Sequence, residues 1–270
     1  MDGKETASRP GGLPSFGHLD MPGRIATERL VLERPLPATP GLAAEIFAAV
    51  DSSRATLRLW LPWIDTTLRP EDELAYLAGP CAEGWERKRS FRYAIRLTAT
   101  GEFAGFVALE TVNETHRKGE VGYWLSDAHV GHGYMRESVL ALERAAFAAG
   151  LNRLVIRNDT RNARSVRVAL ATGHRLEGVL RQDHWDAVAE RFVDTNVFAK
   201  LKSVGNVAHE NSDARVLQAC LALEYDAGSR WLVNQLLSSW ETPGQTVGPT
   251  ARYSVRVPAE SHLPGAQDPA

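Results

Sequence analysis

Apolar and polar residues alternate through the middle of the chain, and this period of two predicts a run of strands. The predicted strands span residues 91–96, 103–109 and 120–125. Residues 99–102, with Gly101, read as the turn that joins the first two strands into a hairpin. A shorter alternation at residues 29–33 stops before Pro35, which cannot donate to a strand ladder. The pattern therefore predicts one early strand and then an antiparallel meander.

Helical spacing separates these strands. Leu42, Ile46 and Phe47 predict a helix after Pro40, and a second helix begins near Pro70 and is kinked or split at Pro80. A third helix follows the meander and ends at a glycine. Its predicted buried face carries Val139, Leu142, Ala146 and Ala149, and its predicted wet face carries Arg136, Glu143 and Arg144, with Gly150 as the stop.

The last part of the pattern supplies a buried strand at residues 153–157 and a helix at 160–172, closed by Gly173. Two final strands span residues 174–180 and 191–200. The order is strand, helices, three strands, helix, strand, helix and two strands. That order predicts a mixed sheet of the α/β class, with antiparallel and parallel neighbours.

The two ends of the chain differ from this central domain, which we place at residues 24–202. Residues 1–23 combine glycine, proline and polar residues and predict a disordered leader. Residues 203–270 predict an appended tail, with two short amphipathic helices and then a flexible end. The tail carries no catalytic motif, and it docks either on the domain or on a partner.

Composition narrows the class of protein. A chain of 270 residues with a formal net charge of −2 is a poor general binder of nucleic acid or anionic membrane. Two cysteines, Cys81 and Cys220, make neither a disulfide framework nor a metal quartet. With no secretory segment and no apolar stretch of membrane-spanning length, we expect a cytoplasmic protein.

A glycine-containing turn carries the first chemical signal. Gly131 and Gly133 stand where a strand passes into a helix, and two glycines there let a ligand approach the backbone closely. The free N–H groups of such a turn and the helix dipole suit a phosphate. Taken alone, a pair of glycines at this spacing is more often only a tight turn.

Two more positions stand out beside this turn. Asn162 and Ser165 share one face at the start of a helix, where Asn162 reads as a cap and Ser165 lies too deep to be one. Glu120 opens the strand that leads into the turn, a place where a carboxylate is usually a solvated flank. Each of these residues has both a structural and a functional interpretation.

Together these features resemble the GNAT superfamily of N-acetyltransferases, in particular the branch that acetylates ribosomal-protein N-termini. The resemblance covers residues 24–202. It rests on residues 27–32, 119–125, the turn with Tyr134 and Met135, then Asn162, Ser165, Ala169, Gly173 and Asp194. Two positions depart from the family pattern. Ala128 stands where the family has Gln or Arg, and His174 stands where it mostly has an aromatic residue.

The resemblance implies a GNAT acyl-CoA N-acyltransferase fold with a splayed central sheet, and acetyl-CoA as co-substrate. Glu120 is then the general base and Ser165 the acid that protonates the departing thiolate. A strand N–H near Leu125 polarises the thioester carbonyl. The residues expected to bind acetyl-CoA are Trp124, Leu125, Val130, Gly131, His132, Gly133, Tyr134, Met135 and Asn162.

The acceptor stays open at this level. The resemblance favours an N-terminal amine of a protein, attacked directly without an acyl-enzyme, and a small amine such as an antibiotic, polyamine or amino acid is the alternative. A non-catalytic acyl-CoA-binding module is a third reading, and a homodimer is left open. No metal is expected.

We expect the acceptor cleft to involve the Trp60 region, residues 65–69 and a loop at residues 181–186. Trp60 and Trp63 either pack in the core or form the wall of this cleft.

Overall fold

The computed structural model describes residues 19–202, which form one mixed sheet of eight strands in the order β1-β2-β3-β4-β5-β6-β8-β7. The strands are β1 (Arg24–Ala26), β2 (Leu30–Glu33), β3 (Phe91–Leu97), β4 (Phe103–Asn113), β5 (Lys118–Leu125), β6 (Arg153–Asp159), β7 (Arg175–Asp186) and β8 (Arg191–Leu201). The α-helices are α1 (Pro40–Ser52), α2 (Arg54–Leu57), α3 (Pro70–Tyr76), α4 (Ala82–Glu86), α5 (Tyr134–Ala148) and α6 (Ala163–Ala171). Short turns of other helical types are η1 (Pro62–Asp65), η2 (Leu77–Cys81) and η3 (Asp127–His129).

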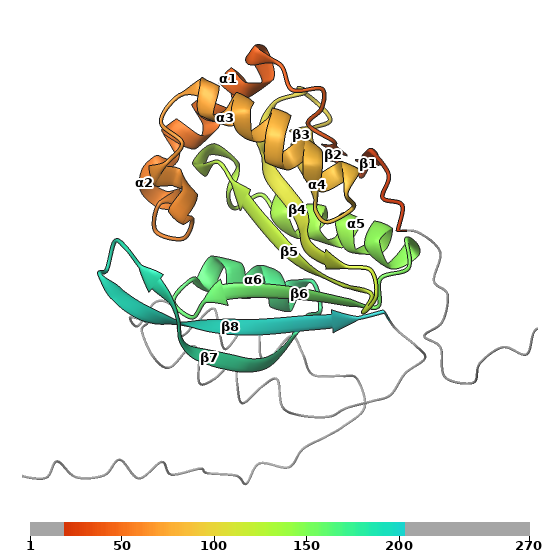
Figure 1. Cartoon of the computed structure of the whole chain (residues 1–270), viewed down its shortest axis with the longest axis vertical. Helices are drawn as coiled ribbons and strands as arrows, with labels where there is room; N and C mark the ends of the chain where they lie inside the picture. Colours follow the sequence, from red (N-terminus) through yellow and green to blue (C-terminus); the bar gives the residue numbers. More distant parts are fainter. Residues whose placement is uncertain (1–18, 203–270) are drawn as a thin grey trace, which may run out of the picture. The chain divides into compact units, whose positions relative to one another are not determined.

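Helices cover both faces of the sheet. Figure 1 shows α1, α3 and α4 over one face of the central strands and α5 behind them. Helix α1 contacts β4 from its side, whereas α5 contacts β1, β2, β4 and β5. A single cluster of buried apolar side chains fills the space between these layers. No helix of the described residues is long and apolar enough to span a membrane.

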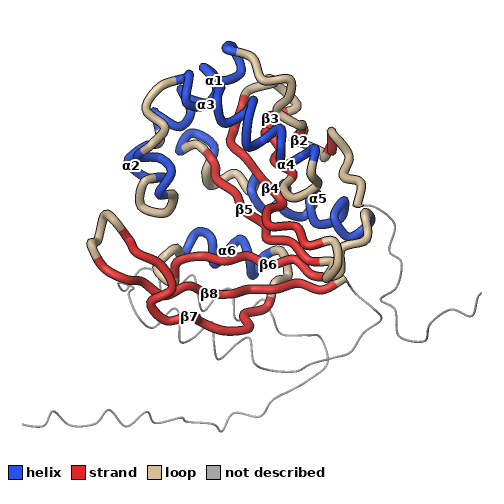
Figure 2. The backbone as a smooth tube through the Cα atoms, viewed as in Figure 1, coloured by secondary structure: helices blue, strands red, loops and turns tan. Residues whose placement is uncertain are grey.

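The sheet opens between β5 and β6, its one parallel pair. These strands are paired only from Lys118 to Glu120, opposite Arg153 to Val155. Beyond Glu120, β5 stays paired with β4 as far as Leu125, while β6 stays paired with β8 as far as Asp159. The two strands therefore separate, and Figure 2 shows the gap between their traces widening away from the paired end. One edge of β5 is left without a neighbouring strand.

A close approach between β4 and β5 fixes the position of β5 along the edge that is opposite the opening. Gly105 of β4 lies opposite Leu125 and has a φ of +151°. A Cβ atom at Gly105 would lie 2.2 Å from the carbonyl oxygen of Trp124. Only glycine fits this contact, because any side chain would push the two strands apart.

The predicted mixed α/β sheet is confirmed, including the meander β3-β4-β5 and the hairpin turn at residues 99–102. Pro80 interrupts its helix as expected, because α3 passes into the π-helical turn η2 there. The sequence pattern missed the short strand β1. The predicted loop at residues 181–186 is wrong, because β7 continues through it to Asp186 with a shift in register between Leu180 and His184.

Residues before the predicted domain boundary at residue 24 pack on the domain. Leu19 and Met21 are buried in the core, and the Tyr93 hydroxyl donates to the carbonyl of Pro22 at 2.8 Å. The last residues of the expected leader therefore pack on the domain. Residues 1–18 and the predicted tail at 203–270 lie outside the described residues.

Glu143 was expected on the wet face of its helix, and this prediction is wrong. Its side chain is only 2% exposed, and its Oε2 pairs with the Lys200 ammonium at 2.6 Å. Lys200 also donates to the carbonyl of Thr172, beside the buried ring of His174. Burial and the nearby Lys200 charge lower the pKa of His174 to about 4, so this ring is neutral at pH 7. The helical periodicity of the sequence could not show that Lys200 of β8 lies beside Glu143.

Lys200→Met should destabilise the domain by about 3 kcal/mol, because it leaves the buried Glu143 carboxylate without its cation. Replacing both partners, as Glu143→Leu with Lys200→Met, should restore most of this loss. The measurement is urea unfolding of the two variants beside the wild type. If the double variant is as unstable as the single one, the pair does not hold α5 to β8 in this way.

Candidate active site

A cavity of about 700 Å³ occupies the opening between β5 and β6. Its lining comes from both strands, from α6, from the turn before α5 and from the segment around α2. Of the residues predicted from the sequence, it is lined by Glu120, Trp124, Leu125, Val130, Gly131, Gly133, Tyr134, Met135, Asn162 and Ser165. His132 is not part of this lining, and its ring stacks on Tyr134 instead. The structure thus brings together elements that lie far apart in the sequence.

The turn before α5 presents its backbone to this cavity. Gly131 and Gly133 have φ values of +86° and +78°, in the left-handed region that favours glycine. Among the described residues, no acceptor takes the N–H groups from Gly131 to Arg136. These donors lie at the N-terminus of a 15-residue helix. An anion such as a pyrophosphate suits that arrangement.

Arg29, which directly precedes β2, contacts this turn. Its guanidinium donates to the carbonyl of His132 at 3.0 Å and pairs with Glu137 at 2.6 Å. Thr27 also donates to Glu137, at 2.6 Å. The Arg29 guanidinium lies 4.9 Å from the centre of the Tyr134 ring. These contacts explain why the motif at residues 27–32 belongs with the glycine turn.

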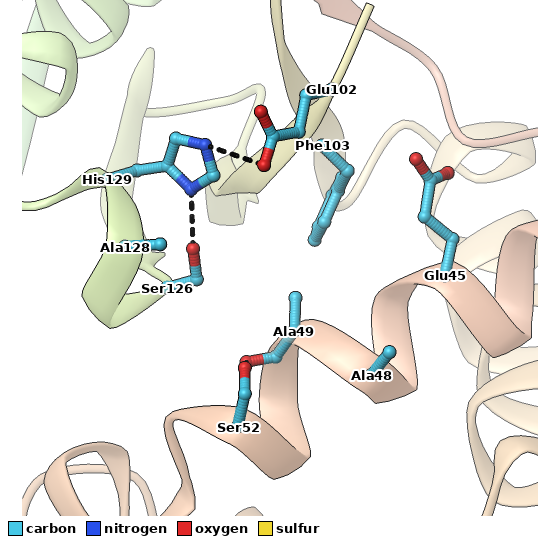
Figure 3. A pocket seen from close by; sticks show the side chains of 9 residues that line it. All are labelled: Glu45, Ala48, Ala49, Ser52, Glu102, Phe103, Ser126, Ala128 and His129. Atoms are coloured by element: carbon cyan, nitrogen blue, oxygen red, sulfur yellow. Dashed lines mark hydrogen bonds and ion pairs between the residues drawn. The ribbon is translucent and has the colours of Figure 1, made fainter.

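A second, smaller pocket of about 280 Å³ lies beside the turn that precedes the glycines, and Ala128 lines it (Figure 3). The His129 ring stands between two partners there. Its Nδ1 is 2.6 Å from the Ser126 hydroxyl, and its Nε2 is 3.4 Å from the Glu102 carboxylate. The turn η3 is therefore held by the contacts of His129.

The free edge of β5 offers hydrogen-bonding groups of its own. The Ser126 N–H donates to the carbonyl of Ala104, just beyond the last residue of β5 that pairs with β4. N–H groups alternate between the two edges of a strand, so the Leu125 N–H points away from β4 and into the opening. An extended amide-containing chain could pair with this edge as a further strand would.

Glu120 stands where β5 and β6 part. Burial raises the pKa of its carboxyl, opposed by Arg157 and assisted by the carboxylates of Glu110 and Asp183. Arg157 is itself paired with Asp183 at 2.6 Å, so its charge is shared. No hydrogen bond from the described residues reaches the Glu120 carboxylate. Such a group is free to accept a proton from a ligand.

Ser165 and Asn162 lie at the start of α6. The Asn162 side-chain oxygen accepts from the Ser165 N–H at 3.0 Å, so Asn162 caps the helix, as its structural interpretation required. Its amide N–H groups stay available to the cavity. The Ser165 hydroxyl is 2.9 Å from the hydroxyl of Tyr123 and accepts from the Asn158 amide at 3.2 Å.

The tryptophans divide between the two expected roles. Trp60 lines the cavity, whereas Trp63 packs 6.2 Å from the ring of Trp124. Trp124 is buried among aromatic rings, and its indole N–H has no acceptor in the described part of the chain. None of the described residues 65–69 lines the cavity, so that part of the expected cleft is wrong.

Several cavity residues were missed by the sequence analysis. The N-terminal halves of α5 and α6 contribute Arg136, Arg164 and Arg167, and β6 contributes Asn158 and Asp159. Asp183 and His184 of β7 also line the cavity, and they fall within residues 181–186, which the sequence analysis expects at the acceptor cleft. Tyr123 lies within the motif at residues 119–125, but the sequence pattern identifies it only as part of a strand. The signal available was the polar end of β6, where Arg157, Asn158 and Asp159 follow the apolar residues 154–156. Residues 19–202 hold no cluster that could bind a metal, and the absence of a metal stays a prediction.

Comparison with known proteins agrees with this geometry. Residues 29–175 match a family model described as an acetyltransferase (GNAT) domain. The uncharacterized N-acetyltransferase YoaA of Bacillus subtilis is 27% identical over 179 residues, which cover 66% of this chain and 96% of that protein. The ribosomal-protein-serine acetyltransferase of Escherichia coli is 28% identical over 115 residues, 42% of this chain and 63% of that protein.

Solved structures show the same fold. The ribosomal L7/L12 α-N-protein acetyltransferase RimL in complex with coenzyme A has a TM-score of 0.61 at 23% identity, covering 66% of this chain and 97% of that one. The microcin C7 self-immunity acetyltransferase MccE in complex with acetyl-CoA and AMP has a TM-score of 0.60 at 19% identity, covering 65% and 94%. The chain belongs to the GNAT family of acetyltransferases, and it is an enzyme that transfers acetyl groups from acetyl-CoA to amines.

Gly133→Val should abolish the rise in melting temperature that acetyl-CoA produces, because valine is strained at a φ of +78° and would displace the turn. Gly101→Val is the matched control, with a φ of +74° in a hairpin turn that does not line the cavity. Both variants should lose stability, but only Gly133→Val should lose the shift. A normal shift with Gly133→Val would rule out the turn as the phosphate site.

Proposed function

We propose that this enzyme acetylates the N-terminal amine of a protein, by direct attack of the amine on acetyl-CoA. The observation that carries the proposal is the position of Glu120 and Ser165, which both line the opening between β5 and β6. A base for the amine and a donor for the leaving thiolate are the two groups that such a transfer needs. The cavity offers both in one place.

The residues present fit acetyl-CoA. The unpaired N–H groups from Gly131 to Arg136 suit its pyrophosphate, and the free edge of β5 suits the amides of its pantetheine arm. The arginines of α5 and α6, Arg136, Arg164 and Arg167, add positive charge to the same wall. When bound, acetyl-CoA supplies an activated acyl group as a thioester.

Glu120 and Ser165 would act from opposite sides of β5. Glu120 and Tyr123 are three positions apart, so their side chains point to opposite faces of the strand. Ser165 contacts Tyr123 and therefore lies on the face away from Glu120. Glu120 would take the proton of the attacking amine, and Ser165 would give one to the leaving sulfur. The Leu125 N–H would donate to the carbonyl oxygen as negative charge develops on it.

Glu120 is the carboxylate that we expect an amine to meet in the cavity. Asp159 and Asp183 also line the cavity, but each is already paired with an arginine, Arg161 or Arg157. The similarity to ribosomal-protein acetyltransferases supports a protein N-terminus as the acceptor. A small-molecule amine is the second candidate, supported by the similar fold of MccE, whose structure holds AMP.

The acceptor class should be resolved by release of free thiol from acetyl-CoA with a panel of amines. We expect turnover with peptides that carry a free N-terminus and no turnover with the same peptides after N-terminal acetylation. Polyamines, aminoglycosides and amino acids form the other arm. Turnover with one of these, and none with peptides, would replace the protein acceptor by a small molecule.

Glu120→Gln should lower kcat by about 10²–10⁴-fold at neutral pH, because it removes the base and keeps the shape. Activity should recover partly as pH rises past about 8, where an α-amine is deprotonated without help. In the wild type, burial raises the pKa of Glu120, so activity should be lost on acidification at a pH above the ordinary value of 4.5. The measurement is kcat against pH with saturating acceptor.

Ser165→Ala provides the contrast. Its defect should persist at high pH, because the leaving thiolate still lacks a donor. Glu177→Gln serves as the control, since Glu177 pairs with Arg153 outside the cavity. If Glu120→Gln turns over at the wild-type rate at pH 7, Glu120 is only a flank of its strand.

A further inference from the structure

We propose that Tyr123 and Asn158 are positioning residues that aim the proton of Ser165 at the cavity, a role that rests on the proposed function. Both side chains reach the same oxygen atom. The Tyr123 hydroxyl lies 2.9 Å from Ser165 Oγ, and the Asn158 amide nitrogen donates to that Oγ at 3.2 Å. All three residues line the cavity.

The number of hydrogen bonds that a serine hydroxyl can make indicates where the Ser165 proton points. A serine hydroxyl accepts two hydrogen bonds and donates one. The Asn158 amide fills one acceptor position of Ser165 Oγ. The single proton of the Tyr123 hydroxyl has two acceptors in reach, Ser165 Oγ at 2.9 Å and the Ser165 carbonyl oxygen at 3.2 Å. We assign this proton to the nearer Oγ, and both acceptor positions of that oxygen are then filled. No other acceptor for Ser165 Oγ lies within hydrogen-bond distance among the described residues. Its one proton is then left to point into the cavity, where the leaving sulfur would be.

The donors are themselves held in place. The Asn196 amide nitrogen donates to Asn158 Oδ1 at 3.0 Å, which leaves the Asn158 nitrogen facing Ser165. Asn196 is fully buried on β8, so this chain of amides is anchored in the sheet. Burial raises the pKa of Tyr123, and its hydroxyl therefore keeps its proton throughout the working pH range.

The arrangement also suits the transfer itself. As the carbon–sulfur bond breaks with its electron pair on sulfur, the Ser165 O–H bond breaks and a sulfur–hydrogen bond forms. The charge left on Ser165 Oγ is stabilised by the two donors until the oxygen regains a proton from water. Glu120 passes the proton taken from the amine to water, and the enzyme returns to its starting state.

A double-mutant cycle on the full chain tests the coupling. Tyr123→Phe should lower kcat about tenfold and leave the affinity for acetyl-CoA unchanged, because one hydrogen bond to Ser165 is lost. In the Ser165→Ala background the same change should alter kcat less than about twofold, since the two residues act through one proton. Equal losses in both backgrounds would show that Tyr123 acts independently and would overturn the proposal.

Tyr93→Phe is the matched control, because it removes another buried tyrosine hydroxyl that is bonded to a carbonyl outside the cavity. It should reduce stability and leave kcat unchanged. Asn158→Asp replaces the donating amide by a group of the same shape that only accepts. The Ser165 hydroxyl should then donate its proton to the introduced carboxylate instead of toward the cavity, and kcat should fall to the level of Ser165→Ala. Near-normal turnover would contradict the proposal that the Ser165 proton points into the cavity.

A readout without turnover separates this inference from the proposed function. Ser165→Cys places a thiol among the same donors, and hydrogen bonds to a thiolate lower the thiol pKa. The rate of alkylation at that position against pH, followed by peptide mass spectrometry, reports this pKa. Adding Tyr123→Phe should raise it by about one unit. An unchanged pKa would overturn the proposal, whatever the enzyme acetylates.

Discussion

The separation of β5 from β6 beyond Glu120 is the constraint on which the rest of the structure depends. A strand edge without a partner exposes backbone groups that must find hydrogen bonds elsewhere. Here the unpaired edge of β5 faces a cavity instead of bulk solvent, and the opposite edge of β5 is paired with β4. The same separation places Glu120 at the point where the strands divide. The proposed coenzyme site and the proposed base thus both depend on one change in strand pairing.

The prediction from sequence was most successful where a pattern is local. Strands β3 to β5 follow from alternation, and Gly131 and Gly133 mark a turn whose positive φ values require glycine. Glu120 and Ser165 were found through the resemblance, since each had a plausible structural reading on its own. The structure adds the reason for their joint appearance, because both line one opening.

The features that the sequence analysis missed depend on contacts between distant segments. Glu143 occupies a polar-looking position on α5, and only the approach of Lys200 from β8 makes its burial tolerable. Leu19 and Met21 stand among residues typical of a disordered leader, yet they pack in the core. Tyr123 of β5 and Asn158 of β6 both contact Ser165, because α6 reaches both strands where they separate, and neither strand pattern records that contact. Long-range geometry of this kind leaves no period in a single sequence.

The close contact at Gly105 between β4 and β5 affects the shape of the cavity from a position outside its lining. Gly105 lies behind the free strand and allows it to sit close to β4, although Gly105 itself does not line the cavity. The position of β5 beside the opening therefore depends on a residue that does not line it. A side chain at Gly105 would move β5 away from β4, and the shape of the cavity would change while every side chain that lines it is retained.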